Sequence, residues 1–215
     1  MNKTKIDWTD KTWNPVTGCK HGCPYCYARA ISKRFGRSFE PEFHHDRLKE
    51  INKIKPGEKI FVCSMADLFG SWVPDEWIES VLMRAGTNWM TTFQFLTKNP
   101  ERYRSFYFGP NMWKGATATN QAQWDRAMNS EVDFVSCEPL LEPINPVGAD
   151  LRWIIIGGCT GASAKQPQEV WVSKIEEWAG ENGIPVFHKD NLGCRVGMAR
   201  KEFPSPEMPR PKLVT

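Results

Sequence analysis

Residues 59–97 read KIFVCSMADLFGSWVPDEWIESVLMRAGTNWMTTFQFLT, and this stretch decides the fold class. It begins with an apolar run at residues 59–65, continues with a helix expected from Pro74 to about Arg84, and ends with a second apolar run at residues 92–97. Short apolar runs with few charges are typical of strands that are buried on both faces, as in parallel sheets. A strand, a helix and a second strand with short connections predict a right-handed βαβ unit.

The same alternation continues in both directions along the chain. Further strands are expected at residues 12–16, 113–119, 132–137, 153–156 and 185–188, and further helices at residues 25–35, 120–128, 170–181 and from Asn99, the expected cap, onward. Six or seven such units predict an α/β fold, a partial (β/α)6-7 TIM-type barrel with parallel strands. We expect residues 1–215 to form a single domain whose proline-rich tail, from about residue 203, lies extended.

Composition excludes several classes of protein. The chain has 215 residues, of which 40% are hydrophobic and 25% charged, as in ordinary globular proteins. It has no apolar run long enough to span a membrane and no signal peptide at its start, so we expect a cytoplasmic protein without a membrane partner. The net charge of +3 neither demands nor excludes nucleic acid. Seven cysteines are too few, and odd in number, for a disulfide framework.

The most distinctive motif is CKHGCPYCY, residues 19–27, in which Cys19, Cys23 and Cys26 have the spacing C-x3-C-x2-C. Thiolates crowded on one short loop converge on a soft metal site, either an iron–sulfur cluster or zinc. Three ligands would leave one iron of a four-iron cluster open to a small cofactor. Zinc would need a fourth ligand. His21 lies inside the loop, and the rest of the chain supplies no second cysteine pair.

With the aromatic Tyr25 just before the third cysteine, this run resembles the signature of the radical S-adenosylmethionine (SAM) superfamily. The resemblance implies a 4Fe-4S cluster on the three cysteines and a SAM molecule that chelates the open iron. It implies reductive cleavage of SAM to a 5′-deoxyadenosyl radical, which abstracts hydrogen from a substrate. An electron donor such as flavodoxin or ferredoxin is implied as a partner. The substrate class stays open among nucleic acid, peptide and small molecule.

A second, narrower resemblance covers nearly the whole chain, from Asp7 to about Gly193. The motifs DWT, WNPVTGC, SMADLF, LTK, EPLL and IGG occur in the order of a family of unknown function found in bacteriophages and bacteria. A phage-encoded member would act in the host cytoplasm. The chain differs from that family in its compact cysteine spacing and in Cys159, which follows two glycines where the family has glutamate.

Polar residues follow most of the expected strands, where ligands of parallel α/β proteins bind. The superfamily resemblance implies that the backbone of Tyr25 meets adenine and that Ser64 and Asp67 bind the methionine amino group. Further residues expected near the cofactor are Thr117, Thr119, Asn120, Glu138, Gly157 and Gly158. The alternative for each of them is helix capping or hydrogen bonding within the rim of the barrel.

Two further cysteines, Cys137 and Cys159, follow adjacent expected strands. A thiol there could return a hydrogen atom to a substrate radical, as in the spore photoproduct lyases, which the cysteine loop distantly resembles. The alternatives are a second cluster or burial as small apolar residues. The competing function for the whole chain is a non-catalytic iron–sulfur or zinc-binding phage protein that associates with nucleic acid.

Overall fold

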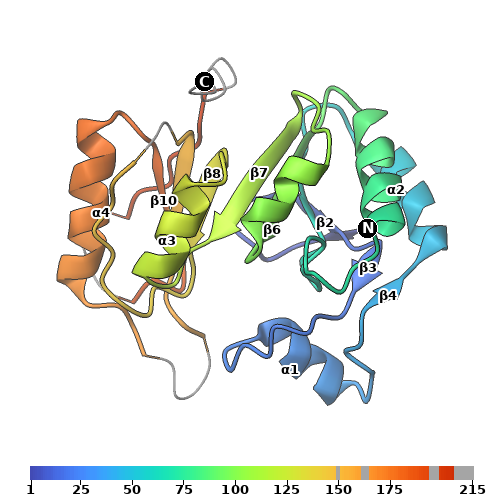
Figure 1. Ribbon diagram of the computed structural model, residues 1–215, viewed down its shortest axis with the longest axis horizontal. Coiled ribbons are helices and arrows are strands. Elements are labelled where there is room, and N and C mark those ends of the chain that lie inside the picture. The colour runs from blue at the N-terminus through green and yellow to red at the C-terminus, as the bar shows by residue number, and fades with distance from the viewer. Residues whose placement is uncertain (149–150, 161–164, 194–198, 206–215) are drawn as a thin grey trace. The chain divides into compact units, whose positions relative to one another are not determined.

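The computed structural model describes residues 1–148, 151–160, 165–193 and 199–205 (Figure 1). The sheet has the strand order β1-β2-β5-β6-β7-β8-β9-β10, and its strands run parallel except for the antiparallel β1. The predicted fold class, an α/β partial TIM-type barrel with parallel strands, is confirmed. The chain forms two compact units, residues 1–114 and 115–215. We describe each by itself, and the single domain stays a prediction.

The first unit places helical segments between parallel strands. Its elements are β1 (Asn2–Lys3), β2 (Lys11–Trp13), β3 (Val16–Thr17), α1 (Tyr27–Arg34), β4 (Glu42–Phe43), the 3-10 helix η1 (His45–Lys53), β5 (Lys59–Val62), α2 (Asp75–Gly86), β6 (Thr92–Thr97), the 3-10 helix η2 (Pro100–Ser105) and the start of β7 (Met112–Thr117). Aromatic rings fill its core: Phe69 lies 4.6 Å from Tyr103 and 6.0 Å from Phe95 between ring centroids. This packing fixes the ends of β5 and β6, where the candidate site lies.

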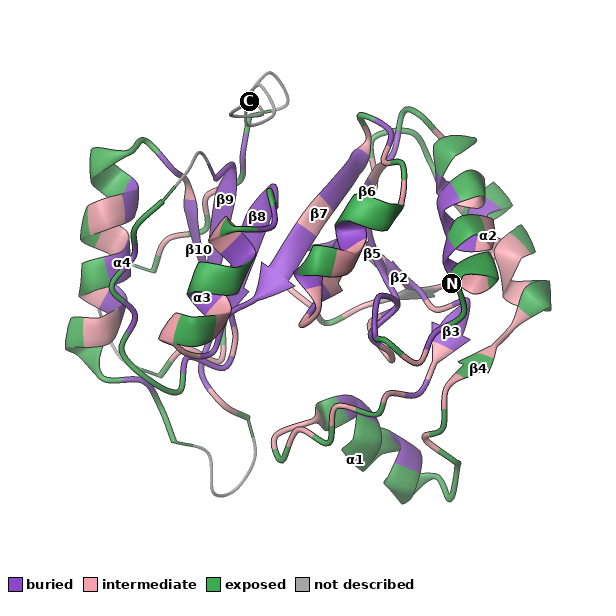
Figure 2. Ribbon diagram, in the orientation of Figure 1, coloured by how far each residue is buried: buried purple, intermediate pink, exposed green. Residues whose placement is uncertain are grey.

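The second unit repeats the same alternation. Its elements are the rest of β7, α3 (Gln121–Met128), β8 (Phe134–Cys137), β9 (Trp153–Ile156), α4 (Glu169–Glu181) and β10 (Val186–His188). Every residue of β8, β9 and β10 is buried, as expected for parallel strands covered on both faces (Figure 2). Among the described residues, no helix is both long and apolar enough to cross a membrane.

Of the predicted tail, residues 203–205 lie in the described part of the chain and residues 206–215 lie outside it. Phe203 packs its ring 5.4 Å from that of Trp153 and 5.1 Å from that of Phe187. Lys201 forms an antiparallel bridge with Phe187. The beginning of the tail is therefore anchored on β9 and β10.

Several predicted boundaries were wrong for local reasons. The strand expected at residues 12–16 is broken after Trp13, because Pro15 has no amide hydrogen for a sheet ladder. The strand expected to reach residue 65 ends at Val62, since Cys63 adopts a φ of 60° and turns the chain. Asn99 does not cap the following helix, because its side-chain amide donates to the carbonyl of Phe69 over 2.9 Å.

A glycine fixes the start of the cysteine loop. Gly18 has a φ of +85°, and a Cβ there would lie 2.1 Å from the carbonyl oxygen of Glu40. Its amide donates to the carbonyl of Met65 over 3.0 Å, and the next amide, of Cys19, donates to Phe39 over 3.1 Å. Only glycine permits this close approach of three chain segments.

We predict that Gly18→Ala lowers the free energy of unfolding by at least about 3 kcal/mol, because it adds a clash with backbone to the strain of a positive φ. Gly57→Ala is the matched control: its φ is +83°, but a Cβ there meets nothing within 4 Å. The control should cost only about 1 to 2 kcal/mol. Urea unfolding followed by circular dichroism measures both, and equal losses would contradict the packing argument.

Candidate functional site

The three predicted ligand cysteines lie on one loop between β3 and α1, and each is half-buried. The amide of Cys26 donates to the carbonyl of Cys23 over 3.2 Å, so the second half of the loop forms a turn. The sulfur of Cys26 then caps α1 by accepting a hydrogen bond from the amide of Arg29 over 3.4 Å. The guanidinium of Arg29 returns to the carbonyl of Cys19 over 2.9 Å. The loop is thus held at both ends.

The donor set of this loop fits a soft metal. Burial raises the pKa of the Cys19 thiol, and the charges of Asp67, Cys23 and Cys26 raise it further. A backbone hydrogen bond at His21 lowers this pKa, but by less than burial raises it. Within the described ranges, no group of three or more His, Cys, Asp or Glu side chains is arranged as a metal site. Three thiols on one short loop remain a suitable donor set for iron–sulfur or zinc chemistry.

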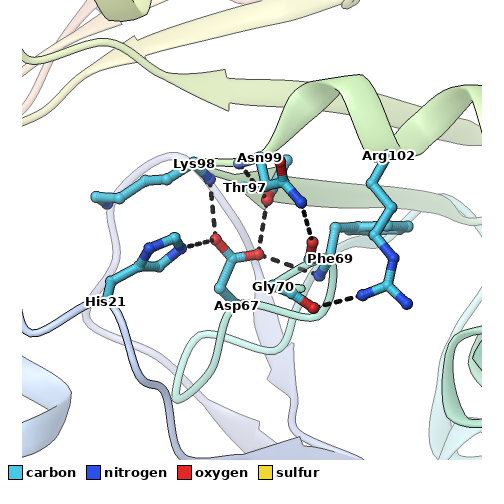
Figure 3. A network of polar contacts seen from close by, with 8 residues as sticks. All are labelled: His21, Asp67, Phe69, Gly70, Thr97, Lys98, Asn99 and Arg102. Carbon is cyan, nitrogen blue, oxygen red and sulfur yellow. Dashed lines mark hydrogen bonds and ion pairs between the residues drawn. The ribbon is translucent and has the colours of Figure 1, made fainter. Parts of the chain in front are cut away.

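Asp67 lies at the centre of a polar network beside this loop (Figure 3). Its Oδ2 accepts hydrogen bonds from Nε2 of His21 over 2.7 Å and from the amide of Lys98 over 2.9 Å. Its Oδ1 accepts from the hydroxyl of Thr97 over 2.6 Å and from the amide of Phe69 over 3.1 Å. One carboxylate thus joins the cysteine loop, the loop after β5 and the end of β6.

The electrostatics of Asp67 follow from these contacts. The side chain is only 8% exposed. Burial alone would raise the pKa of its carboxyl, but the hydrogen bonds from His21, Lys98 and Thr97 outweigh burial and lower the pKa. Asp67 is therefore a charged acceptor at neutral pH. The ring of His21 also packs edge-on against Trp72, 4.8 Å between ring centroids.

Other contacts support the network from the same unit. The guanidinium of Arg102 donates to the carbonyl of Gly70 (Figure 3). It also donates to the carbonyl of Val73 and pairs with Asp75, so it holds the loop that follows Asp67. The ammonium of Lys98 lies 5.9 Å from the ring centroid of Tyr25. A positive charge thus lies next to the cysteine loop.

Ser64, the other residue predicted after the second strand of the barrel, has protein partners. Its hydroxyl donates to Oδ1 of Asn14 over 3.2 Å, and the same oxygen accepts the amide of Met65 over 3.1 Å. The hydroxyl of Tyr27, the first residue of α1, donates to the carbonyl of Ser64. Ser64 therefore links α1 to the turn after β5.

The remaining predicted residues belong to the second unit, where Glu138 forms a small cluster of its own. Its Oε1 pairs with the ammonium of Lys189 and accepts from Nδ2 of Asn191 over 3.3 Å. The same amide donates to the carbonyl of Gly158 over 2.8 Å. The carboxylate thus ties the end of β8 to the loop after β10.

The two predicted glycines pack closely against the chain itself. A Cβ on Gly157 would lie 3.0 Å from Oδ1 of Asn191, and one on Gly158 would lie 2.0 Å from Oε1 of Gln166 and 2.7 Å from the carbonyl oxygen of Asn191. These contacts explain why the chain has glycine at both positions.

Thr117, Thr119 and Asn120 lie between β7 and α3. Thr117 is buried at the end of β7. Both the amide and the hydroxyl of Thr119 donate to Oε1 of Gln123, over 2.8 and 3.0 Å. Oδ1 of Asn120 accepts from the amide of Gln123 over 3.0 Å and caps α3. Thr119 and Asn120 thus have the capping roles that were the alternative to cofactor binding.

The cysteines outside the loop differ in accessibility. Cys137 ends β8 opposite Ile156 and is fully buried, and burial raises the pKa of its thiol to about 12. Burial likewise raises the pKa of Cys63 to about 12. Cys159 is half-buried, three residues beyond the β9 residue that pairs with Cys137. Cys194 lies outside the described residues.

The sequence did not identify His21, Thr97 and Lys98 as a unit with Asp67, nor Lys189 and Asn191 as partners of Glu138. His21 and Asp67 are separated by 46 residues, and Glu138 and Lys189 by 51. The LTK motif at residues 96–98 was the one available signal, because it places two of the four Asp67 donors at a strand end.

The sequence profile of the family described as "Protein of unknown function (DUF5131)" matches residues 3–202. The chain belongs to this family. The match spans both the cysteine loop and the Asp67 network, so both lie in the part of the chain that the DUF5131 profile covers. A search of curated protein sequences found no match.

Two solved structures resemble this DUF5131 member. One is a spore photoproduct lyase variant with bound AdoMet and a dinucleoside spore photoproduct, with a TM-score of 0.48, and the other is a second variant of spore photoproduct lyase, with a TM-score of 0.46. Each is 13% identical to the chain, and the similarity covers 86% and 87% of it. The chain spans 58% and 59% of the length of those proteins.

We predict that Asp67→Ala lowers the free energy of unfolding by about 3 kcal/mol, because it leaves several buried donors without an acceptor. Hydrogen exchange at residues 19–23 should accelerate, since His21 loses its partner. Asp75→Ala is the control, because Asp75 pairs with Arg102 but its side chain is 63% exposed; it should cost less than about 1 kcal/mol. Unchanged exchange in Asp67→Ala would contradict the coupling.

The pH dependence of this effect follows from the lowered pKa of Asp67. A carboxyl whose pKa is lower in the folded state stabilises that state above its unfolded pKa, about 4, and loses the effect as pH falls through the folded pKa. The difference in stability between the native chain and Asp67→Asn should therefore be constant near neutral pH and shrink below about pH 4. A difference that grows in acid would show the opposite shift.

We also predict that iodoacetamide modifies Cys159 in the folded protein but leaves Cys63 and Cys137 unmodified. A thiol with a pKa of about 12 is ionised to roughly one part in ten thousand at pH 8, and burial adds a steric barrier. Mass spectrometry after digestion measures the labelling, and unfolding in urea should make all three cysteines reactive. Fast labelling of Cys137 before unfolding would contradict its burial.

Proposed function

We propose that this protein is a radical SAM enzyme. The observation that carries the proposal is the cysteine loop: three half-buried thiols with the spacing C-x3-C-x2-C, on the loop between β3 and α1 of a chain whose larger sheet is a partial TIM-type barrel. When bound, a 4Fe-4S cluster and SAM supply one-electron cleavage of the sulfonium bond and a 5′-deoxyadenosyl radical that abstracts hydrogen from the substrate. Cys19, Cys23 and Cys26 would hold the cluster.

The chain's own residues would act first by positioning this loop. Gly18 and Cys19 are fixed by backbone hydrogen bonds to Met65 and Phe39. The imidazole of His21 is fixed by the buried carboxylate of Asp67. Both oxygens of Asp67 already accept hydrogen bonds from protein donors. We therefore assign Asp67 to positioning the cysteine loop and not to binding the methionine amino group of SAM. A loop fixed in this way presents its thiols to a cluster with little loss of entropy.

Charge beside the loop supports the same function. The ammonium of Lys98 lies next to the ring of Tyr25, within the cysteine motif. A cation at this place suits a site whose thiolates are negative and whose cofactor carries a carboxylate. Tyr25 would contribute its backbone to the adenine. Ser64 would support this edge through its contacts with Asn14 and Tyr27.

Cofactor binding is also proposed for residues that follow later strands. Thr117, Glu138, Gly157 and Gly158 are candidates for it at the ends of β7, β8 and β9. The thiols of Cys137 and Cys159 are candidates for hydrogen-atom donation to a substrate radical, a step that breaks the S–H bond and forms a C–H bond. Cys159 is the more accessible of the two, because it is half-buried whereas Cys137 is fully buried. A flavodoxin or ferredoxin would supply the electron.

We predict that anaerobic reconstitution yields about four irons and four sulfides per chain, and that reduced protein cleaves SAM to 5′-deoxyadenosine. Cys19→Ser, Cys23→Ser and Cys26→Ser should each abolish the brown chromophore, because a hydroxyl is a poor ligand for this soft site. Iron and sulfide analysis, absorption spectra and chromatography of the nucleoside products measure these effects.

Cys63→Ala is the matched control for cluster loading, because Cys63 is a buried cysteine outside the loop. It should retain the iron and sulfide content of the native chain. Stoichiometric zinc without uptake of iron would overturn the proposal in favour of a zinc-binding protein. A stable cluster whose spectrum does not change when SAM is added would favour a non-catalytic iron–sulfur protein.

A further inference from the structure

The segment that contains the cysteine loop and α1 is strongly basic. Residues 20–39 contain five lysines and arginines and no aspartate or glutamate. This local charge of +5 exceeds the +3 of the whole chain, so the other residues together carry a net charge of −2. The excess of basic over acidic residues thus lies in this segment, although the two kinds of residue are almost equal in number over the whole chain. Such asymmetry is typical of a surface that binds a polyanion.

The structure exposes these cations to solvent (Figure 2). Lys33 and Arg34 occupy the last turn of α1, and Arg37 follows two residues after the helix cap. All three are exposed, and among the described residues none of them forms an ion pair with an acid. Their charges are therefore available to an external partner. The helix buries only Ala28 and Ser32.

An exposed aromatic ring lies among these cations. Phe35 is 63% exposed. The guanidinium carbons of Arg34 and Arg37 lie 6.0 and 5.7 Å from the centre of its ring. An exposed phenylalanine beside two guanidinium groups offers planar surfaces for stacking together with charges for a phosphate backbone. We call Lys33, Arg34, Phe35 and Arg37 the α1 surface.

We propose that the α1 surface binds a single strand of nucleic acid, with phosphates on Lys33, Arg34 and Arg37 and a base stacked on Phe35. A duplex keeps its bases stacked inside and would leave Phe35 unused. The inference rests on the proposed function and deepens it by naming the substrate class. Because α1 begins directly after Cys26 and has eight residues, a strand held on this surface lies one short helix, about 12 Å at a rise of 1.5 Å per residue, from the cysteine loop.

The test uses fluorescence anisotropy with the full-length chain and a labelled oligothymidylate about a dozen nucleotides long, repeated with oligouridylate and with a DNA duplex. We expect the single strands to bind more tightly than the duplex. The double variant Lys33→Ala/Arg34→Ala should weaken binding and lower the slope of log affinity against log salt by about 1.4, since each phosphate contact on a single strand contributes about 0.7. Phe35→Ala should weaken binding about ten-fold with no change in slope.

Two controls match these variants. Lys49→Ala/Lys53→Ala removes the same charge from exposed lysines of η1, and Tyr107→Ala removes an aromatic ring that is 85% exposed. Both should bind the oligonucleotides like the native chain. Equal losses of affinity in the control and test variants would overturn the proposal. So would binding to heparin with the same affinity as to the oligonucleotides, if Phe35→Ala left that affinity unchanged. Either result would indicate a general attraction of polyanions.

Three further results separate this inference from its alternatives. Binding to vesicles of anionic lipid but not to oligonucleotides would overturn it and make α1 a membrane-surface helix. Oligonucleotide binding with the expected variant effects, in a protein that neither loads iron nor cleaves SAM, would uphold the α1 surface and overturn the proposed function. Cleavage of SAM without any binding of single strands would overturn the α1 surface alone.

Discussion

The buried carboxylate of Asp67 is the interaction on which the candidate site depends. A charged group 8% exposed is tolerated only when its lone pairs are satisfied, and four donors satisfy them here. These donors come from three segments, so the carboxylate fixes the position of each relative to the others. His21 is the one donor within the cysteine loop. The geometry of a loop without regular secondary structure is therefore set by an acid that follows a strand of the barrel.

The strands were predicted best where hydrophobic burial alone determines them. Residues 92–97 and 153–156 match β6 and β9, because both are apolar runs between clear turn residues. No helix or strand was predicted between residues 37 and 55, which contain β4 and η1. Leu48 and Ile51 of η1 lie three residues apart, as on one face of a helix, but the two-residue β4 is too short to show a period. The two-residue β4 exists because it pairs with β3, a contact that sequence pattern does not encode.

The candidate site also contains residues that the sequence reveals and residues that it does not. Three cysteines on one loop could be found from the sequence, because their chemistry is local and their residue type is rare. The pairs His21–Asp67 and Glu138–Lys189 could not, since long-range folding brings them together. For Asn120 two interpretations were open, because an amide at a strand end can contact a cofactor or cap the next helix; the structure shows that it caps α3.

The residues that would carry the two proposed activities lie in one continuous segment of the chain. The loop thiols and the cations of α1 lie within residues 19–37, so the distance between them is set by a single turn and a single helix. Cys26 belongs to both, because its sulfur caps the helix that carries Arg34 and Phe35. The loop after β5 anchors this segment through Asp67 and through the carbonyl of Ser64. A change in the Asp67 contacts would therefore displace the thiols and the basic helix together, which makes the two functions mechanically dependent on the same buried charge.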